Sequence, residues 1–178
     1  GTVKVEFTFD AIALAGKEIV AFESLEHEGI EVATHADIYD EGQTVKVEPK
    51  PEIGTIATDA ADGDHEAVAD DDVAIIDEVR YENLEPGREY VLTGTLIDKT
   101  TANPVEVDGL PLTTTVAFTP TEPNGSVEVS FSFNGSELAG HRMVAFESLA
   151  LDGDVVATHK DIEDEGQSVD LVEKPGPG

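Results

Sequence analysis

Hydrophobic and polar residues alternate in two stretches of the chain, residues 3–9 and residues 127–133. Each stretch places two valines and two phenylalanines at every second position, with polar residues between them. A period of two residues is typical of a β-strand that buries one face. The sequence therefore predicts two equivalent strands at widely separated positions.

Further short runs of this kind follow, separated by turn-forming dipeptides. These dipeptides are Pro-Gly at 86–87, Asn-Gly at 134–135, and Asp-Gly at 108–109 and 152–153, which favour turns over helix interiors. The other predicted strands cover residues 72–79, 89–98, 112–118, 142–149, 154–159 and 167–172. Many short strands within about 120 residues predict an all-β fold, an antiparallel β-sandwich. The acidic stretch 59–72 predicts a solvated loop.

The chain also contains an internal repeat. Residues 1–45 align with residues 125–169 and are identical at 26 of the 45 positions, whereas the sequence between the copies occurs once. Residues kept between two copies are restrained by shared structure or shared chemistry. We interpret residues 1–48 as the C-terminal part of a preceding repeat, 49–53 as a linker, 54–173 as one complete module of ordinary domain size, and 174–178 as the start of another linker.

Composition excludes several classes of function. The formal net charge is -29, from 39 acidic and 10 basic residues, so nucleic acid and anionic membrane surfaces are not expected partners. No apolar run is long enough to span a bilayer. The chain has no cysteine, which excludes disulfides and zinc-thiolate sites. This composition is consistent with a secreted, extracellular protein.

Three strings are more specific: YENLEPGREYVLTGTLIDKTT (81–101), VAFESL (144–149) and HKDIEDEGQSV (159–169). Together they resemble the VaFE repeat of Gram-positive surface adhesins, a family of immunoglobulin-like domains that form an internal Thr-Gln ester bond. The resemblance implies an immunoglobulin-like β-sandwich and a cell-adhesion role as a stalk module of a cell-wall-anchored protein. It also implies neighbouring repeats as partners, and a single self-crosslinking event in place of enzymatic turnover.

The resemblance also implies roles for individual residues. The family nucleophile falls within residues 54–58, where the closest register selects Thr58 and leaves Thr55 as the alternative. The glutamine that receives the threonine corresponds to Gln167. The assisting residues correspond to Asp77, Glu147 and His159. In residues 1–48 the equivalents are Glu23, His35 and Gln43, with no counterparts of Thr58 and Asp77.

The chemistry explains why these residue types are needed. Two carboxyl groups in an apolar interior share a proton, which raises one apparent pKa. Such a pair can donate a proton to the amide, and a neutral histidine can accept one from the threonine. Loss of ammonia then makes the reaction one-way, and no cofactor is needed. We interpret Asp161, Asp164 and Glu165 as a solvated turn and expect no metal, since their spacing does not fit an EF-hand loop.

Two other functions stay open at this stage. A ligand-binding module would use a loop or a sheet face, although the three tyrosines and seven phenylalanines fall mostly in strand patterns. A hydrolase would need a cleft and an exchangeable substrate. The pairing of residues 1–48 is open as well. They could exchange strands with another chain, belong to a truncated neighbour, or replace residues 125–173 against 51–124. We favour the arrangement that keeps the natural order of the repeat, in which residues 51–124 pair with residues 125–173.

Overall fold

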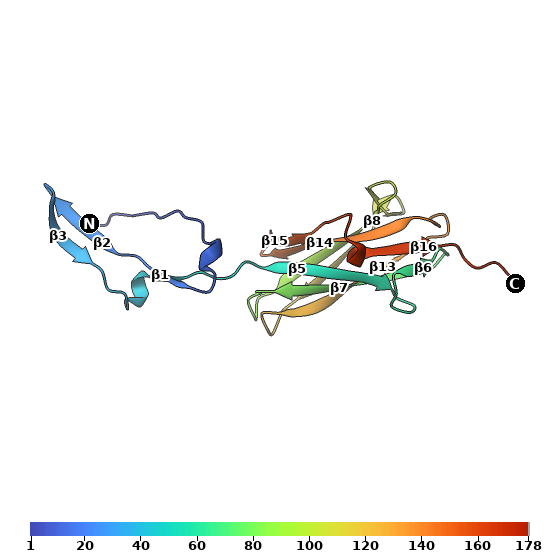
Figure 1. Cartoon of the computed structure of the whole chain (residues 1–178), viewed down its shortest axis with the longest axis horizontal. Helices are drawn as coiled ribbons and strands as arrows, with labels where there is room; N and C mark the ends of the chain where they lie inside the picture. The colour runs from blue at the N-terminus through green and yellow to red at the C-terminus, as the bar shows by residue number, and fades with distance from the viewer. Residues whose placement is uncertain (178) are drawn as a thin grey trace. The chain divides into compact units, whose positions relative to one another are not determined.

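The computed structural model describes residues 1–177. They form two compact units, residues 1–50 and the residues from Pro51 onward. We call the first the N-terminal unit and the second the module (Figure 1). The predicted boundary between the linker and the module differs from the observed one by two residues. The first strand of the module already begins at Glu52 and pairs there with Glu82, so residues 52 and 53 belong to the module and not to a linker.

The module is an antiparallel, immunoglobulin-like β-sandwich, as the sequence predicts (Figure 1). One sheet has the order β12-β8-β14-β16-β6, with β15 also beside β14 and β9 beside β8. The other sheet has the order β13-β7-β5. The elements are β5 (Glu52–Asp59), β6 (Glu66–Val68), β7 (Val73–Glu82), β8 (Tyr90–Asp98), β9 (Asn103–Pro104), β10 (Glu106–Val107), β11 (Leu110–Pro111), β12 (Thr113–Phe118), β13 (Gly125–Phe133), β14 (Arg142–Leu151), β15 (Asp154–His159), the 3-10 turn η3 (Glu165–Gln167) and β16 (Ser168–Val172).

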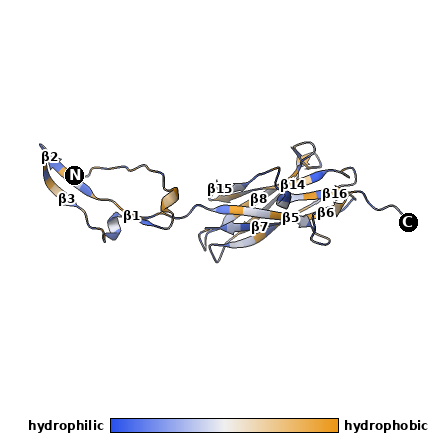
Figure 2. Cartoon of the chain, in the orientation of Figure 1, coloured by the Kyte–Doolittle hydropathy of each residue, from blue (hydrophilic) through white to orange (hydrophobic). Residues whose placement is uncertain are grey.

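Alternation along the strands builds the core between the two sheets. Hydrophobic and hydrophilic segments follow one another along the strands of the module (Figure 2), and the inward residues are buried. The most deeply buried side chains include Ile75, Leu92, Phe131, Met143 and Leu149, each 0 % exposed. Burying such side chains contributes about 1.5–3 kcal/mol each to folding.

Glycine is needed at one point where the sheets approach closely. Gly94 lies on β8 directly opposite Glu147 of β14. A Cβ atom at this position would come within 2.8 Å of the Phe131 ring and 2.9 Å of Val129. The absence of a side chain therefore leaves room for the other sheet to pack beside Glu147.

The turn dipeptides behave as predicted in two hairpins. β10 and β11 are joined by Asp108-Gly109, and β14 and β15 by Asp152-Gly153. All four residues have positive φ, between 51° and 85°. This is the backbone of a two-residue type I′ turn, whose twist matches that of the flanking strands.

Part of the acidic stretch 59–72 is not a loop. Residues Glu66–Val68 form β6, which runs parallel to β16, and Ala67 is 1 % exposed. Charged neighbours mask this short strand in the sequence, because the single apolar residue that it buries produces no visible alternation.

The N-terminal unit consists of short paired strands. β1 (Glu18–Val20) pairs with β4 (Thr44–Lys46), and β2 (Glu23–His27) pairs with β3 (Ile30–His35). Two 3-10 turns complete it, η1 (Ile12–Leu14) and η2 (Glu41–Gln43). Among the described residues, no helix is long and apolar enough to cross a membrane.

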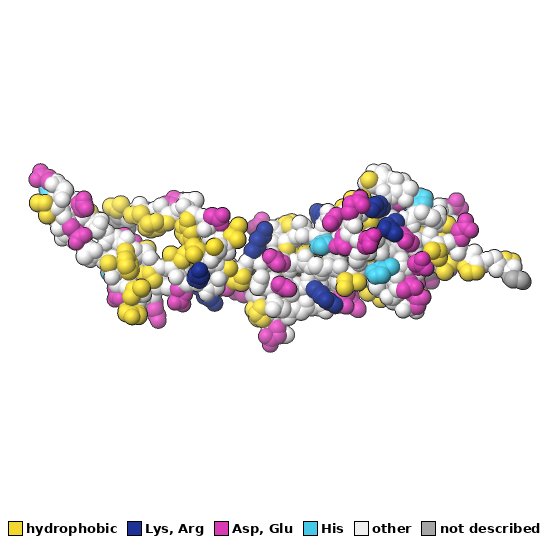
Figure 3. Space-filling model, in the orientation of Figure 1, with side chains coloured by type: hydrophobic (Ala, Val, Ile, Leu, Met, Phe, Trp, Pro, Cys, Tyr) yellow, Lys and Arg dark blue, Asp and Glu magenta, His cyan; other side chains and the backbone are white. Residues whose placement is uncertain are grey.

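The strand predicted at residues 3–9 does not form. In the module the equivalent strand, β13, is hydrogen-bonded to β7 along its whole length, and the N-terminal unit contains no counterpart of β7. Without a partner for its backbone the segment stays irregular. Its apolar side chains remain exposed, including Val3 at 88 % and Phe7 at 59 %. Hydrophobic side chains gather accordingly on the surface of this unit (Figure 3).

Candidate crosslinking site

Four polar residues from four elements meet inside the module. They are Thr55 of β5, Asp77 of β7, Glu147 of β14 and Gln167 of η3. Asp77, Glu147 and Gln167 are 0 % exposed, and Thr55 is 8 % exposed. β5 lies against β14, β15, β16 and η3 (Figure 1), which brings the first strand of the module to the residues near its end.

The structure places Thr55, and not Thr58, at this site. Side chains alternate across a strand, and the inward residues of β5 are Thr55 and Ala57, the latter directly opposite Asp77. Thr58 is three residues beyond Thr55, so its side chain lies on the other face, opposite Ile76. The register that selects Thr58 is therefore wrong for this fold, and the alternative threonine occupies the position.

The Gln167 amide fills a gap in the larger sheet. β14 pairs with β16 up to Val144 and with β15 from Glu147 onward, so one edge of Ala145 and Phe146 has no strand beside it. There the Gln167 Nε2 donates to the Ala145 carbonyl oxygen at 2.7 Å and to Glu147 Oε2 at 3.0 Å. The side-chain amide is thus held in one orientation by its nitrogen.

Buried polar atoms without a hydrogen-bond partner are concentrated at this site. Among the described residues of the module, all such side-chain atoms belong to the four site residues: Thr55 Oγ1, both Asp77 carboxyl oxygens, Glu147 Oε1 and Gln167 Oε1. Each buried polar atom left unpaired costs about 1–3 kcal/mol, and folded proteins contain few of them. Their concentration at one place makes this cluster the candidate site of the module.

The two buried carboxyl groups act on one another. Burial raises the pKa of Glu147 to about 11, and the adjacent Asp77 carboxyl contributes to that rise. Burial also raises the pKa of Asp77. Two ionised carboxylates offer only acceptors, whereas one shared proton supplies a donor between them. The raised pKa values of both carboxyls favour one proton shared between Asp77 and Glu147.

This shared proton predicts a pH dependence of stability. Above the ordinary glutamate pKa of 4.5, Glu147 is ionised in the unfolded chain but protonated in the folded one. The free energy of unfolding should then fall as pH rises, by up to about 1.4 kcal/mol per pH unit. Chemical denaturation of an uncrosslinked Thr55→Val chain between pH 5 and 8 measures this slope.

The matched control is Glu147→Gln in the same Thr55→Val background, for which the slope should be shallower. Asp164 and Asp170 have lowered pKa values, so the stability that they contribute is lost only in acid, outside this range. Equal slopes with and without Glu147 would mean that this carboxyl is ionised in the folded state.

His159 lies at the end of β15, directly opposite Glu147. Its Nε2 is 2.8 Å from Asp164 Oδ2, and this contact holds the pKa of Asp164 below its usual value. Asp164 also caps η3, since its Oδ1 accepts from the Gly166 backbone nitrogen at 2.8 Å. One aspartate thus fixes both the histidine ring and the turn that carries Gln167.

Sequence reasoning missed this role of Asp164 by assigning it to a solvated turn. A signal was available, because the aspartate is kept as Asp40 in the other copy, three residues before the glutamine in both. An aspartate just before a helical turn is a preferred N-cap.

Elsewhere, Asp59, Asp62 and Asp64 bring carboxylate oxygens within 4.8 Å of one another, but an exposed acidic cluster alone does not define a metal site.

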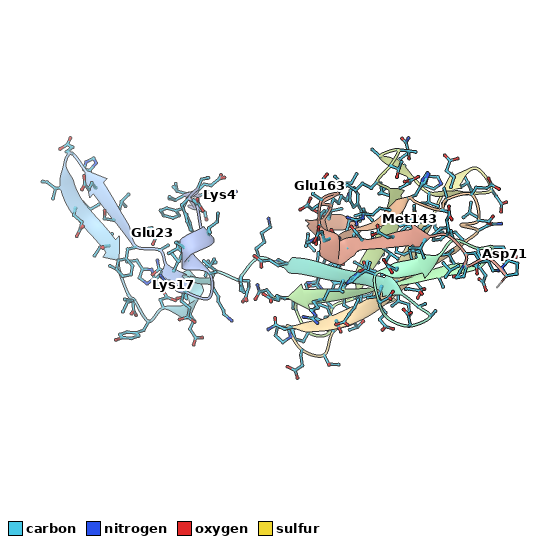
Figure 4. All side chains as sticks on the ribbon, turned by 45° about the vertical axis from the view of Figure 1, so that its right-hand side comes forward. Lys4, Lys17, Glu23, Asp71, Met143 and Glu163 are labelled. Atoms are coloured by element: carbon cyan, nitrogen blue, oxygen red, sulfur yellow. The ribbon has the colours of Figure 1, made fainter. Side chains whose placement is uncertain are left out.

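The N-terminal unit repeats half of this arrangement. Glu23 of β2 lies directly opposite His35 of β3, and Gln43 Nε2 donates to Glu23 Oε2. His35 Nε2 is 3.0 Å from Asp40 Oδ2, as His159 is close to Asp164. Glu23 is labelled in Figure 4, where it lies in the N-terminal unit. We call these residues the half-site, because no threonine or second carboxyl group completes them within this unit.

The family model of the T-Q ester bond containing domain matches residues 1–47 and 51–171. The chain therefore belongs to the family of T-Q ester bond containing domains. No curated protein matches it.

Among solved structures, the chain is similar to a bacterial adhesin from Mobiluncus mulieris, described as containing intramolecular disulfide, isopeptide and ester bond cross-links. In one crystal form the TM-score is 0.59 at 21 % identity, covering 70 % of this chain and 58 % of the adhesin chain. In a second crystal form the TM-score is 0.58 at 20 % identity, with the same coverage. The chain thus spans less than two thirds of that adhesin chain, and the likeness shows a shared fold.

Proposed function

We propose that the module is a structural unit stabilised by an ester bond between Thr55 and Gln167, which forms once and without an enzyme. The observation that carries this proposal is the burial of the Thr55 hydroxyl together with the Gln167 amide and two carboxyl groups. Residues 0 % exposed are closed to an exchangeable substrate, which argues against a hydrolase that turns over.

The reaction assigns a role to each residue. Asp77, the ionised member of the pair, accepts the Thr55 hydroxyl proton while the oxygen adds to the Gln167 carbonyl carbon. Glu147, which already accepts from Nε2, delivers its proton to that nitrogen as the C–N bond breaks and ammonia leaves. One proton then remains on the carboxyl pair, as at the start. The products are an ester and ammonia, so atoms and charge balance.

His159 has a positioning role in this scheme. Its Nε2 faces Asp164, and its electrostatic effect on Asp77 opposes the burial that raises the pKa of that carboxyl. The Thr55 side chain interacts with the Asp77 carboxyl and opposes the rise in its pKa, so we assign proton acceptance to Asp77 in preference to the histidine.

A mechanical role follows from where the bond would lie. Thr55 is on the first strand of the module and Gln167 directly precedes the last, so an ester between them would carry tension past the intervening strands. Together with the likeness to an adhesin and the acidic, cysteine-free composition, this supports a stalk module of an extracellular, cell-wall-anchored adhesin. Neighbouring repeats would be its partners.

Intact mass tests the proposed bond. The folded chain should weigh about 17 Da less than its sequence, the mass of one ammonia lost in acyl transfer. Thr55→Val and Gln167→Ala should each abolish the loss. Thr58→Val is the matched control and should keep it, because that side chain lies on the other face of β5.

Peptide mapping identifies the partners. A linked peptide containing Thr55 and Gln167 is the expected product. The full sequence mass after prolonged folding would contradict the proposal. A peptide linking Thr55 to Gln43 would instead mean that residues 51–124 pair with the N-terminal unit and not with 125–173.

A further inference from the structure

Two apolar side chains of β13 lie beside the carboxyl pair of the site. Val129 is directly opposite Asp77 of β7, so the two side chains point to the same face of the smaller sheet, with their Cβ atoms about 5 Å apart. Phe131 follows two positions later and shares that inward face. All three residues are 0 % exposed. The Asp77 carboxyl is therefore covered by hydrocarbon on the side of β13.

Gly94 lets the same two side chains reach Glu147. Gly94 of β8 is directly opposite Glu147 of β14 in the larger sheet, and a Cβ atom at Gly94 would stand on the inner face about 5 Å from the Glu147 Cβ. Val129 Cγ1 and Phe131 Cζ already occupy that place, at 2.9 Å and 2.8 Å from it. Valine and phenylalanine side chains have no hydrogen-bonding atoms, so Glu147 is desolvated on this side and gains no donor in return.

Polar and charged groups face the pair from other elements. They come from β5, from β15 and from the turn η3 with its cap, and they are Thr55, His159, Gln167 and Asp164. Asp164 adds to the rise in the pKa of Asp77, and the other three groups oppose the rise in one carboxyl or both. Burial is nevertheless the largest cause of both raised pKa values. Val129 and Phe131 supply part of that burial from the smaller sheet.

We propose that Val129 sets the pH range in which the ester forms, because it keeps water and hydrogen-bond donors away from the Asp77–Glu147 pair, and that Gly94 makes room for it. Val129 is a positioning residue and acts through the two carboxyls. Hydrocarbon beside them preserves the form with one shared proton, which can accept a proton from Thr55 and deliver one to the leaving nitrogen. This inference rests on the ester chemistry proposed for the module.

The substitution Val129→Thr tests this role in the full chain. Threonine nearly matches valine in shape but places a hydroxyl beside the carboxyls, where it can donate to the ionised form. The alkaline, falling side of the pH–rate profile should move towards acid by about one to two pH units, the worth of a hydrogen bond to a charged group. On that side the variant should react about 10- to 100-fold more slowly than the unmodified chain.

The profile is measured as the time course of ammonia loss by intact mass. Unreacted full chain is diluted from denaturant into buffers from about pH 5 to pH 10, a range that covers both sides of the profile. Val127→Thr is the matched control, because it makes the same change on the same face of β13 but lies opposite Val79 in place of Asp77. Its profile should coincide with that of the unmodified chain.

A rate lowered equally at every pH, or a profile that does not move, would overturn the inference and leave Val129 a packing residue. If threonine prevents folding, Val129→Ala decides the question. It removes two methyl groups and makes room for a water that the unpaired carboxyl oxygens can hold, so its profile should move in the same direction. An unmodified chain that loses no ammonia at any pH would instead refute the ester itself, so the two failures are distinguishable.

Discussion

Replacing Glu147 with glutamine should slow ester formation by about 100-fold or more, the usual contribution of a positioned general acid or base. Glutamine keeps the shape of the side chain but cannot hold the proton that Glu147 retains at neutral pH because of its burial. The measurement is the time course of mass loss after unreacted chain is diluted from denaturant. Asp77→Asn should have a similar effect, since it removes the acceptor for the threonine proton.

Glu128→Gln is the matched control, because this glutamate is exposed on β13 and should react at the normal rate. Circular dichroism should show the same β-sheet signal for all three variants. Crosslinking of Glu147→Gln or Asp77→Asn at the rate of the unmodified chain would reduce these carboxyls to structural polar groups.

The substitution Thr55→Val should have a large effect on stability and lower the free energy of unfolding by about 4–5 kcal/mol. The proposed ester would close a loop of 112 residues, 167 minus 55. Closing a loop of that length restricts the unfolded chain about as much as a long-range disulfide does. Valine matches threonine in shape and lacks only the hydroxyl, so little packing is lost. Urea denaturation measures the difference, with Thr58→Val as the control that retains the bond.

Two further comparisons separate the crosslink from local effects. Gln167→Ala should cost a similar amount, and the double variant Thr55→Val/Gln167→Ala should cost little more than either single one, because both remove the same bond. Additive losses would show that each side chain stabilises the fold on its own and that no shared covalent link is involved.

Much of the fold was predictable because strands with one buried face leave a period of two in the sequence. β15 was predicted at its observed bounds, and the two Asp-Gly turns lie where expected. Residues 3–9 show the same period and yet form no strand. Alternation indicates a strand face that needs burial. A strand also needs a neighbouring strand to hydrogen-bond its backbone, and the N-terminal unit contains no counterpart of β7 to serve as that neighbour.

The site was predictable as a set of residue types but not in register. Thr55 and Thr58 are three positions apart, and a motif match cannot tell which of them faces inward. The face is fixed by pairing with β7, which sets Ala57 opposite Asp77. Asp164 escaped notice for a related reason, since its two contacts, with His159 and with the Gly166 backbone, exist only once the loop is folded.

The position of Thr55 near the start of β5 has a consequence for the length of a chain under load. With the ester in place, the 111 residues between Thr55 and Gln167 cannot be drawn out, even if every strand of the module separates. At about 3.6 Å per extended residue, roughly 400 Å of contour length is withheld. Only the few residues outside the ring could lengthen, so a fibre of such modules would keep nearly constant length up to the force that breaks a covalent bond.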